Sequence, residues 1–223
     1  LTDNTTAADI GSGTGISAAP FLEKGHTIYG VEPNLPMREK AMQLLEKYPN
    51  FHSINGTAEN TSLPDASVDL VICAQAFHWF DPDKAKAEFK RITTGQGRTA
   101  LIWNERNIHS PFEEAYEHLI LKYATDYTAV KHKNISPEKI RSFFSPATMY
   151  LQTFQNEQQL GFEGLKGRWL SSSYVPNEGN PHYTEAVTEL KNLFDTFQSA
   201  GKVCITYETR LYFGALKRET TRN

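Results

Sequence analysis

The run from Asp9 to Gly15 constrains the fold most, because three glycines at alternate positions directly follow a short apolar stretch. Glycine lets a backbone turn sharply and brings its N–H groups against a ligand without obstruction from a Cβ atom. The spacing is G-x-G-x-G. The dinucleotide fingerprint is G-x-G-x-x-G, and Ile16 occupies the place of its third glycine, which argues against NAD or FAD.

A second apolar run, residues 26–31, ends at Glu32, seventeen residues after Gly15. An acidic side chain at the tip of a second strand can accept hydrogen bonds from both hydroxyls of a ribose. A glycine-rich turn alone is weak evidence, because plain tight turns use the same residues. With strand, helix, second strand and Glu32 in this order, the sequence predicts a nucleoside cofactor.

Several segments, in this order, resemble the class I S-adenosylmethionine-dependent methyltransferases of type 11. Residues 8–15 match that family's first motif, and residues 30–34 resemble its acidic ribose contact. Residues 56–65 are similar to its adenine-binding turn, and residues 68–81 resemble its fourth strand and active-site loop. Residues 167–176 resemble a late segment of a subgroup that includes enzymes similar to trans-aconitate methyltransferase.

The resemblance implies which residues hold S-adenosylmethionine. Asp9 would order the glycine turn and reach the amino acid end of the cofactor, directly or through water, and Glu32 would bind its ribose. The Ala58 N–H and the Glu59 carboxylate would meet the adenine edge; the alternative for Glu59 is a solvated loop carboxylate. The full expected set is Asp9, Gly11, Ser12, Gly13, Thr14, Gly15, Glu32, Pro33, Ala58, Glu59, Ala74, Gln75 and Ala76.

His78 and Trp79 follow the fourth strand, where the family places residues that face the transferred methyl group. Histidine, with an ordinary pKa of about 6.5, can deprotonate a hydroxyl or amine acceptor, whereas a carboxylate acceptor needs no base. His78 is therefore either a general base or a structural residue, and Trp79 either walls a substrate pocket or fills core. The expected substrate-side residues are His78, Trp79, Trp103, Arg168 and Tyr174.

Arg168 has two interpretations. Together with Tyr174 it could bind an anionic acceptor through its guanidinium fork, or it could form a surface ion pair. The sequence alone does not choose between these roles.

Strand and helix signals alternate through the first half of the chain, which is typical of βαβ units on a parallel sheet. We expect strands at Ala7–Ile10, Thr27–Val31, Phe51–Ile54, Val68–Cys73 and Thr99–Trp103. One helix should begin near Pro36 and another at Asp81-Pro82. Their expected buried faces are Met37, Ala41, Leu44 and Leu45 for the first, and Ala85, Phe89 and Ile92 for the second.

After Asn104 the alternation ends. Helical spacing marks residues 112–123, 136–144 and 183–197. A sixth strand is expected at Met149–Phe154, and a last strand over Lys202–Tyr207 and Arg210–Gly214, with a bend or turn at Glu208-Thr209. The predicted fold class is α/β: a Rossmann-like seven-stranded, mostly parallel sheet with helices on both faces, an antiparallel last strand, and a helical cap inserted after strand 5.

We expect one structural domain overall. Residues 1–104 would form the S-adenosylmethionine-binding core, 105–200 the cap helices plus strand 6, and 201–223 the last strand. The cap helices would form a lid that shapes a substrate pocket; the alternative for their aromatic stripes is ordinary core. The resemblance also implies a helix before the first strand, so we expect the chain, which starts at Leu1, to be part of something longer.

The bulk composition excludes several classes of protein. A net charge of −3 gives no general attraction to nucleic acid. No apolar stretch approaches the roughly 20 residues of a membrane span, and we find no metal-ligand spacing and expect no secretory leader. Cys73 and Cys204 lie in apolar runs and are expected to be buried thiols, which is consistent with a cytoplasmic location.

The sequence thus predicts a methyltransferase that uses S-adenosylmethionine and a small-molecule acceptor with an oxygen, nitrogen or carboxylate nucleophile. A domain that binds the cofactor without catalysis is the first alternative. An NAD-dependent oxidoreductase is a less favoured one, because Ile16 interrupts the fingerprint. Nucleic acid and membrane are not expected partners, and the sequence does not indicate an oligomeric state.

Overall fold

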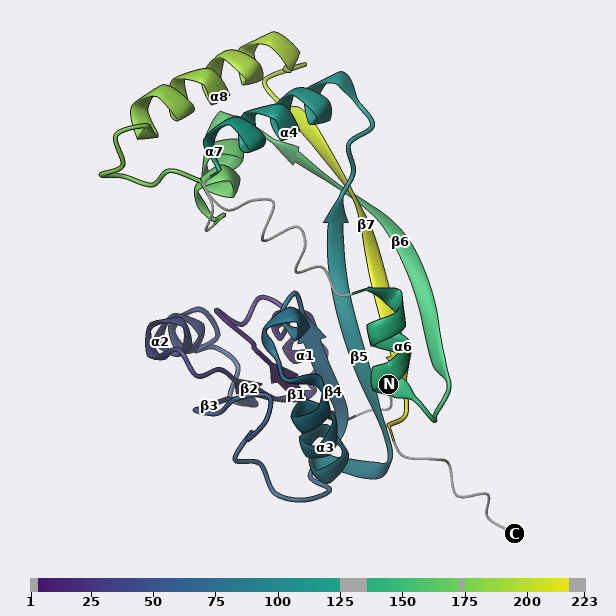
Figure 1. The fold of residues 1–223 in the computed structure, drawn as a ribbon. Helices are drawn as coiled ribbons and strands as arrows, with labels where there is room; N and C mark the ends of the chain where they lie inside the picture. Colours follow the sequence, from purple (N-terminus) through teal and green to yellow (C-terminus); the bar gives the residue numbers. More distant parts are fainter. Residues whose placement is uncertain (1–3, 125–135, 173–174, 217–223) are drawn as a thin grey trace. The chain divides into compact units, whose positions relative to one another are not determined.

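The computed structural model describes residues 4–124, 136–172 and 175–216, in which seven strands form one sheet of order β3-β2-β1-β4-β5-β7-β6 (Figure 1). β1 to β5 pair in parallel, and β7 runs antiparallel between β5 and β6. The bounds are β1 Thr6–Ile10, β2 Thr27–Val31, β3 Phe51–Ile54, β4 Val68–Ala74, β5 Thr93–Arg106, β6 Met149–Leu160 and β7 Val203–Gly214. The predicted Rossmann-like fold class is confirmed.

The helices begin where the sequence supplies caps. Asp81 accepts hydrogen bonds from the N–H groups of Asp83 and Lys84 immediately before Pro82, and Ser136 caps the helix that begins at Pro137. The helices are α1 Ala19–Leu22, α2 Leu35–Leu44, the 3₁₀ helix η1 Phe77–Trp79, α3 Pro82–Ile92, α4 Pro111–Tyr123, α6 Pro137–Phe144, α7 Phe162–Leu170 and α8 Tyr183–Phe197.

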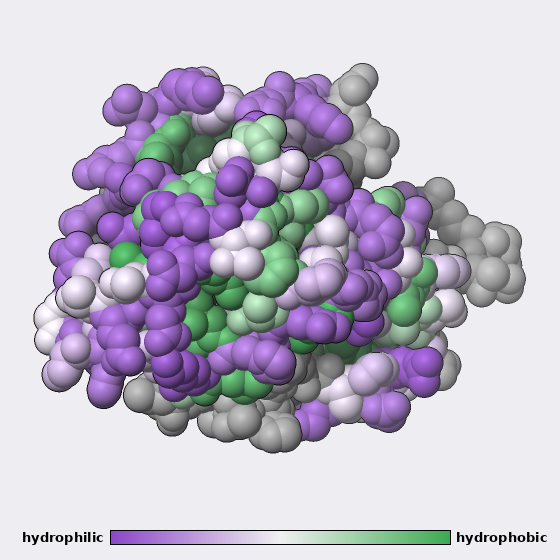
Figure 2. Space-filling model, turned by 90° about the horizontal axis from the view of Figure 1, so that it is seen from above, coloured by the Kyte–Doolittle hydropathy of each residue, from purple (hydrophilic) through white to green (hydrophobic). Residues whose placement is uncertain are grey.

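Within the described ranges, each helix is too short or too polar to cross a bilayer. Hydrophilic side chains cover much of the face seen in Figure 2, with smaller apolar patches between them.

The chain divides into two compact units. Among the described residues, the first comprises 4–103, 136–152 and 210–216, and the second comprises 104–124, 153–172 and 175–209. The expected single domain, its boundaries near residues 104 and 200, and the lid formed by the cap helices stay predictions.

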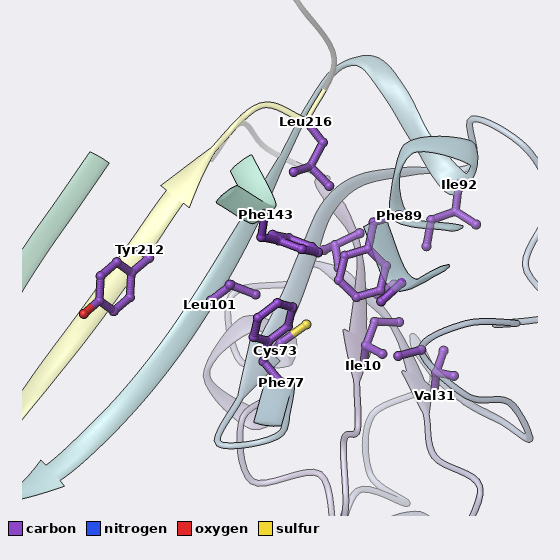
Figure 3. Close-up of a cluster of buried hydrophobic side chains, with 14 of the residues drawn as sticks. Ile10, Val31, Cys73, Phe77, Phe89, Ile92, Leu101, Phe143, Tyr212 and Leu216 are labelled. Carbon is purple, nitrogen blue, oxygen red and sulfur yellow. The ribbon is translucent and has the colours of Figure 1, made fainter. Parts of the chain in front are cut away.

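Two helical layers cover the two faces of the sheet in the first unit. Because successive side chains of a strand point to opposite faces, neighbouring residues of β1 and β4 enter different clusters. Val71 and Cys73 pack with Phe89 of α3, and with α6, whereas Ile72 packs in the cluster that holds Leu22 of α1. Figure 3 shows the first cluster, with Phe77 and Phe143 at its centre; their ring centroids are 4.6 Å apart.

The two cysteines differ in burial. Cys73 is fully enclosed in that cluster, and burial raises the pKa of its thiol well above the ordinary value (Figure 3). The prediction of a buried thiol is confirmed there. It is wrong for Cys204, which is only half-buried and has its Sγ 3.8 Å from Glu157 Oε2.

Several predicted boundaries and faces are wrong. β5 begins at Thr93 instead of Thr99 and continues past Trp103, β6 continues past Phe154 to Leu160, and β7 has no break at Glu208-Thr209. β6 is exposed along almost its whole length, so no apolar alternation marks where it ends. In α2, Met37 and Leu44 are 45% and 52% exposed, because only Ala41 and the adjoining Leu45 pack inward.

The second unit contains a buried carboxylate, Glu113 at the start of α4. Its Oε1 accepts the N–H and hydroxyl of Thr206 on β7, at 2.8 and 2.7 Å, and its Oε2 accepts the N–H groups of His109 and Ser110. Burial alone would raise the pKa of Glu113, but these hydrogen bonds outweigh it and lower the pKa to about 2. The apolar core beside it includes Trp169 and Leu190.

Glu88 is the comparable buried carboxylate of the first unit. Its carboxylate pairs with Arg91 and accepts both the N–H and the hydroxyl of Thr61, at 2.8 and 2.6 Å. The hydrogen bonds from Arg91, and then those from Thr61 against the cost of burial, lower the pKa of Glu88 to about 2. The side chain thereby ties α3 to the loop after β3.

We therefore predict that Glu88→Gln lowers the free energy of unfolding at pH 7 by about 1–3 kcal/mol, since the charged hydrogen bonds are lost. A lowered carboxyl pKa stabilises the fold above the unfolded value of 4.5 and stops doing so as pH falls through about 2. Urea unfolding should show that the loss of unfolding free energy caused by Glu88→Gln is smaller at pH 3 than at pH 7. Glu39→Gln, on the exposed side of α2, is the matched control. A difference independent of pH would contradict the assignment.

Candidate functional site

The glycine turn is anchored where the strand order reverses. Asp9 of β1 lies opposite Gly30 of β2 and Ile72 of β4, so the turn leaves the sheet between these two neighbours. The N–H groups of Gly11 and Ser12 donate to the Val31 carbonyl at 2.9 and 3.2 Å. In open α/β sheets such a reversal at the carboxyl ends of the strands is the usual ligand crevice.

The three glycines of the turn, Gly11, Gly13 and Gly15, all have positive φ, at +69°, +54° and +81°. A Cβ on Gly11 would lie 2.6 Å from the Ala76 Cβ, and one on Gly15 would lie 2.5 Å from Leu45. A Cβ on Gly13 would meet nothing nearer than the Met37 sulfur at 3.9 Å. Packing therefore requires the outer two glycines, whereas Gly13 leaves room for a ligand to approach the backbone.

Glu32 fastens this turn to the end of β2. Its carboxylate is 7% exposed; Oε2 accepts the N–H of Gly13 at 3.0 Å and Oε1 accepts the N–H of Asn34 at 2.9 Å. Each carboxylate oxygen has a second lone-pair site, so the two oxygens can still accept hydroxyl donors. Pro33 beside it is exposed. The ribose contact expected of Glu32 stays a prediction.

Arg38 braces the same corner and was not found from the sequence. Its Nη1 donates to the carbonyls of Glu32 and Pro33, at 2.9 and 2.8 Å, and to Asn55 Oδ1 at 3.0 Å. It thus joins the end of β2 to the loop after β3. Nothing in the sequence signals this, because the three partners come from two segments.

Asp9 is fully buried and only partly satisfied. Ser17 donates its hydroxyl to Oδ2 at 2.6 Å, while Oδ1 has no hydrogen-bond partner in the part of the chain that the structure describes. Burial raises the pKa of the Asp9 carboxyl to about 6; the Ser17 hydrogen bond opposes this rise and the neighbouring Glu32 carboxylate adds to it. An under-satisfied carboxylate of this kind is typical of ligand sites.

The loop after β4 packs on the glycine turn. Gln75, which follows Ala74, has φ +55° and donates its N–H to the Ile102 carbonyl at 2.9 Å. A non-glycine residue with positive φ is uncommon and often lies at a functional site. Ala76 is the residue whose Cβ opposes Gly11, so the loop and the turn are brought together.

The predicted adenine turn is joined to the same region. Thr57 and Asn60 form a bridge that presents Ala58 and Glu59 at its tip, and Ala58 is 3% exposed. Glu59 Oε1 accepts the N–H of Asp81 at 2.9 Å, which is the start of α3. Glu59 is half-buried and hydrogen-bonded, and its contact with an adenine edge stays a prediction.

The expected substrate-side residues lie in different environments. His78 is half-buried, with its ring centroid 4.8 Å from that of Trp79, which is 66% exposed; the alternative that Trp79 fills core is wrong. Trp103 is 6% exposed and packs edge-on against Phe77 and Tyr212, 6.2 and 5.8 Å between centroids. Its contact with a substrate stays a prediction.

Arg168 lies on α7 in the second unit. Its guanidinium stands over the Tyr207 ring, 5.3 Å from the centroid, a cation–π contact that the sequence did not reveal. Tyr174 lies outside the described residues. Binding of an anionic acceptor by these two residues stays a prediction.

The chain is similar to known methyltransferases. Residues 8–101 match the sequence model of a family described as a methyltransferase domain. A relative, an uncharacterized methyltransferase of Mycobacterium tuberculosis, is 38% identical over 99 residues, which are 44% of this chain and 40% of that protein. The chain thus spans less than half the length of this curated relative.

Solved structures share the fold. A candidate type II methyltransferase of Anaeromyxobacter dehalogenans has a TM-score of 0.69 at 19% identity, covering 96% of this chain and 90% of its own. A geranyl diphosphate methyltransferase solved in complex with S-adenosylmethionine has a TM-score of 0.56 at 15% identity, covering 97% and 80%. The resemblance to the trans-aconitate subgroup stays a prediction.

The residues at the turn fit S-adenosylmethionine. The open face of Gly13 admits a ligand to the backbone, and Glu32 can accept hydroxyl donors. The unpartnered Oδ1 of Asp9 suits a cationic donor such as an ammonium group.

The burial of Asp9 predicts a stability cost in the ligand-free chain. A carboxyl pKa raised from 3.8 to about 6 means that the fold loses stability as pH rises through this window. Asp9→Asn should therefore raise the free energy of unfolding at pH 7.5 by about 1–2 kcal/mol, part of the gain being offset by a buried amide donor.

Thermal unfolding at pH 7.5 and pH 4.5 tests this, with the gain expected only at the higher pH. Asp195→Asn, on the exposed face of α8, should change the midpoint little at either pH. A loss of stability on Asp9→Asn at pH 7.5 would mean that the buried carboxylate is better satisfied than the described contacts indicate.

Proposed function

Because residues 8–101 match the sequence model of a methyltransferase domain, we propose that this chain transfers the methyl group of S-adenosylmethionine to a small-molecule acceptor. The observation that carries the proposal is the glycine turn at the strand-order reversal, open only at Gly13 and flanked by the carboxylates of Glu32 and Asp9. The net charge of −3 favours a small acceptor over nucleic acid. Two free cysteines favour a cytoplasmic location.

Each contact has a separate task in binding. Gly13 lets the cofactor reach the N–H groups at the turn, Glu32 accepts the ribose hydroxyls, and Asp9 receives the ammonium of the amino acid end. Ala58 and Glu59 meet the adenine edge from the neighbouring turn. The bound cofactor supplies a methyl group that is already activated by its sulfonium, so the protein mainly has to position the acceptor, which can lower the barrier by roughly 7–11 kcal/mol.

His78 is proposed to act on the acceptor side. It follows β4 on η1, close to the loop that packs on Gly11, and its half-buried ring is next to the exposed indole of Trp79. For a hydroxyl or amine acceptor, the imidazole takes the proton that the nucleophile loses. For a carboxylate acceptor, it orients the anion. Trp79 covers the bound acceptor with its ring face.

Isothermal titration with S-adenosylhomocysteine tests the proposal, with NADH titrated in parallel. We expect micromolar binding of S-adenosylhomocysteine and none of NADH. Binding of NADH alone would favour an oxidoreductase. A broad screen of acceptors would then be read out by the release of product. Binding of S-adenosylhomocysteine with no product released in this screen would favour a domain that binds the cofactor without catalysis.

The contrast between Gly13 and Gly15 gives a sharper prediction. Gly13→Ala should keep the fold at the cost of the strain of a Cβ at φ +54°, and it should reduce the affinity for S-adenosylhomocysteine at least tenfold, because the new methyl group occupies the ligand's approach. Gly15→Ala should instead lower the unfolding temperature, since its Cβ would lie 2.5 Å from Leu45. Circular dichroism melts and calorimetric titration of both variants distinguish these effects. If Gly13→Ala and wild type bind S-adenosylhomocysteine with equal affinity, the ligand does not bind at this face of the turn.

His78→Ala should leave the affinity for S-adenosylhomocysteine within twofold of wild type. With an acceptor identified by the screen, it should lower kcat about 10²-fold or more if the acceptor is a hydroxyl or amine. The exposed His52→Ala on β3 is the control. An unchanged kcat would show that His78 has a structural role and does not act as a base.

A further inference from the structure

One buried atom of the first unit is not accounted for by the fold. Asp9 is 0% exposed, and its Oδ1 is among the buried side-chain oxygens without a hydrogen-bond partner in the described ranges. An ionised carboxylate oxygen left in this state costs the protein free energy that a neutral packed residue would not. Such a group is retained most readily where a ligand completes it.

The surroundings of Asp9 supply one donor and further negative charge. Ser17, half-buried two residues after Gly15, reaches back to donate its hydroxyl to Oδ2 at 2.6 Å. Glu32 at the end of β2 raises the pKa of Asp9 electrostatically, and the Cys73 thiol of β4 has its own pKa raised by burial and by the charge of Asp9. The titratable groups that act on Asp9 are therefore acids.

We propose that Ser17 is the positioning residue that holds Asp9 ionised, with Oδ2 engaged and Oδ1 left to receive the ammonium of S-adenosylmethionine, so that cofactor affinity depends on the protonation of Asp9. The inference rests on the proposed function. Ser17 does not touch the cofactor; it acts through Asp9 by stabilising the charged carboxylate in one orientation.

The proton balance follows directly. When Asp9 is protonated, its carboxyl must release that proton to solvent before Oδ1 can accept an N–H from the ammonium. Because burial places the Asp9 pKa at about 6, roughly half of the ligand-free molecules carry this proton at pH 6 and almost none do at pH 8. At pH 6, where the ligand is already an ammonium, binding should therefore release about half a proton per site, and at pH 8 Asp9 itself should release almost none.

The test is calorimetric titration of the full chain with S-adenosylmethionine at pH 6 and pH 8, each in two buffers of different ionisation enthalpy. Ser17→Ala should weaken binding about three- to tenfold at pH 6 and less than twofold at pH 8. It should also increase the number of protons released at pH 6. Ser17→Thr, which keeps the hydroxyl, should restore both values.

Ser67→Ala is the matched control, because its hydroxyl donates to the Pro64 carbonyl away from the glycine turn. A loss of affinity on Ser17→Ala that is equal at both pH values would overturn the inference, since it would show a structural effect only. Absence of proton release by wild type at pH 6 would overturn it as well.

A measurement without cofactor separates this inference from the proposed function. Carbon NMR of the Asp9 carboxyl should show titration at about 6 in wild type and at a higher pH in Ser17→Ala. If wild type binds neither S-adenosylmethionine nor S-adenosylhomocysteine, the proposed function and the ligand half of the inference fail together. If binding occurs but Ser17→Ala leaves the Asp9 titration unchanged, only the inference fails.

Discussion

The site depends on one carboxylate, Glu32, whose two oxygens accept the N–H groups of Gly13 and Asn34. These bonds fasten the glycine turn to the end of β2, and Asn34 then caps α2 by accepting the N–H of Met37. Arg38, one residue later, closes the corner by donating to the Glu32 carbonyl at 2.9 Å. Hydrogen bonds therefore connect the turn, the second strand and the second helix to one another. The position of each part of the site depends on these connections.

This arrangement concentrates acidic groups that the ligand-free fold does not neutralise. Asp9 is buried beside Glu32, and its pKa is raised to about 6 by burial, with a further contribution from that neighbour. The contrast with Glu88 and Glu113 is informative, because their full sets of donors lower the pKa of each to about 2. The same chemical group thus stabilises the fold where its hydrogen bonds are complete and opposes folding where one is missing. A cationic ligand would supply the missing donor at Asp9.

Sequence reasoning found the parts of the fold that are encoded locally. The bounds of β2 and β3 and the cap of α3 follow from apolar runs and from Asp81-Pro82, and the glycine spacing located the turn. It failed where tertiary packing determines which side chains are buried and where an element ends. Met37 and Leu44 have helical spacing but no surface to cover, and β6 continues past Phe154 without an apolar face. The Ser17 hydroxyl reaches Asp9 eight residues away, a contact that only the folded turn creates.

The central claim is that the glycine turn of the first unit holds the cofactor between Glu32 and Asp9. A crystal structure of the chain grown with S-adenosylhomocysteine tests it most directly. We predict that the ribose hydroxyls lie within hydrogen-bond distance of the Glu32 carboxylate, that the ligand passes over Gly13, and that its ammonium is bonded to Asp9 Oδ1. Ligand density elsewhere on the protein, with Gly13 uncovered and Oδ1 still unpartnered, would contradict the account.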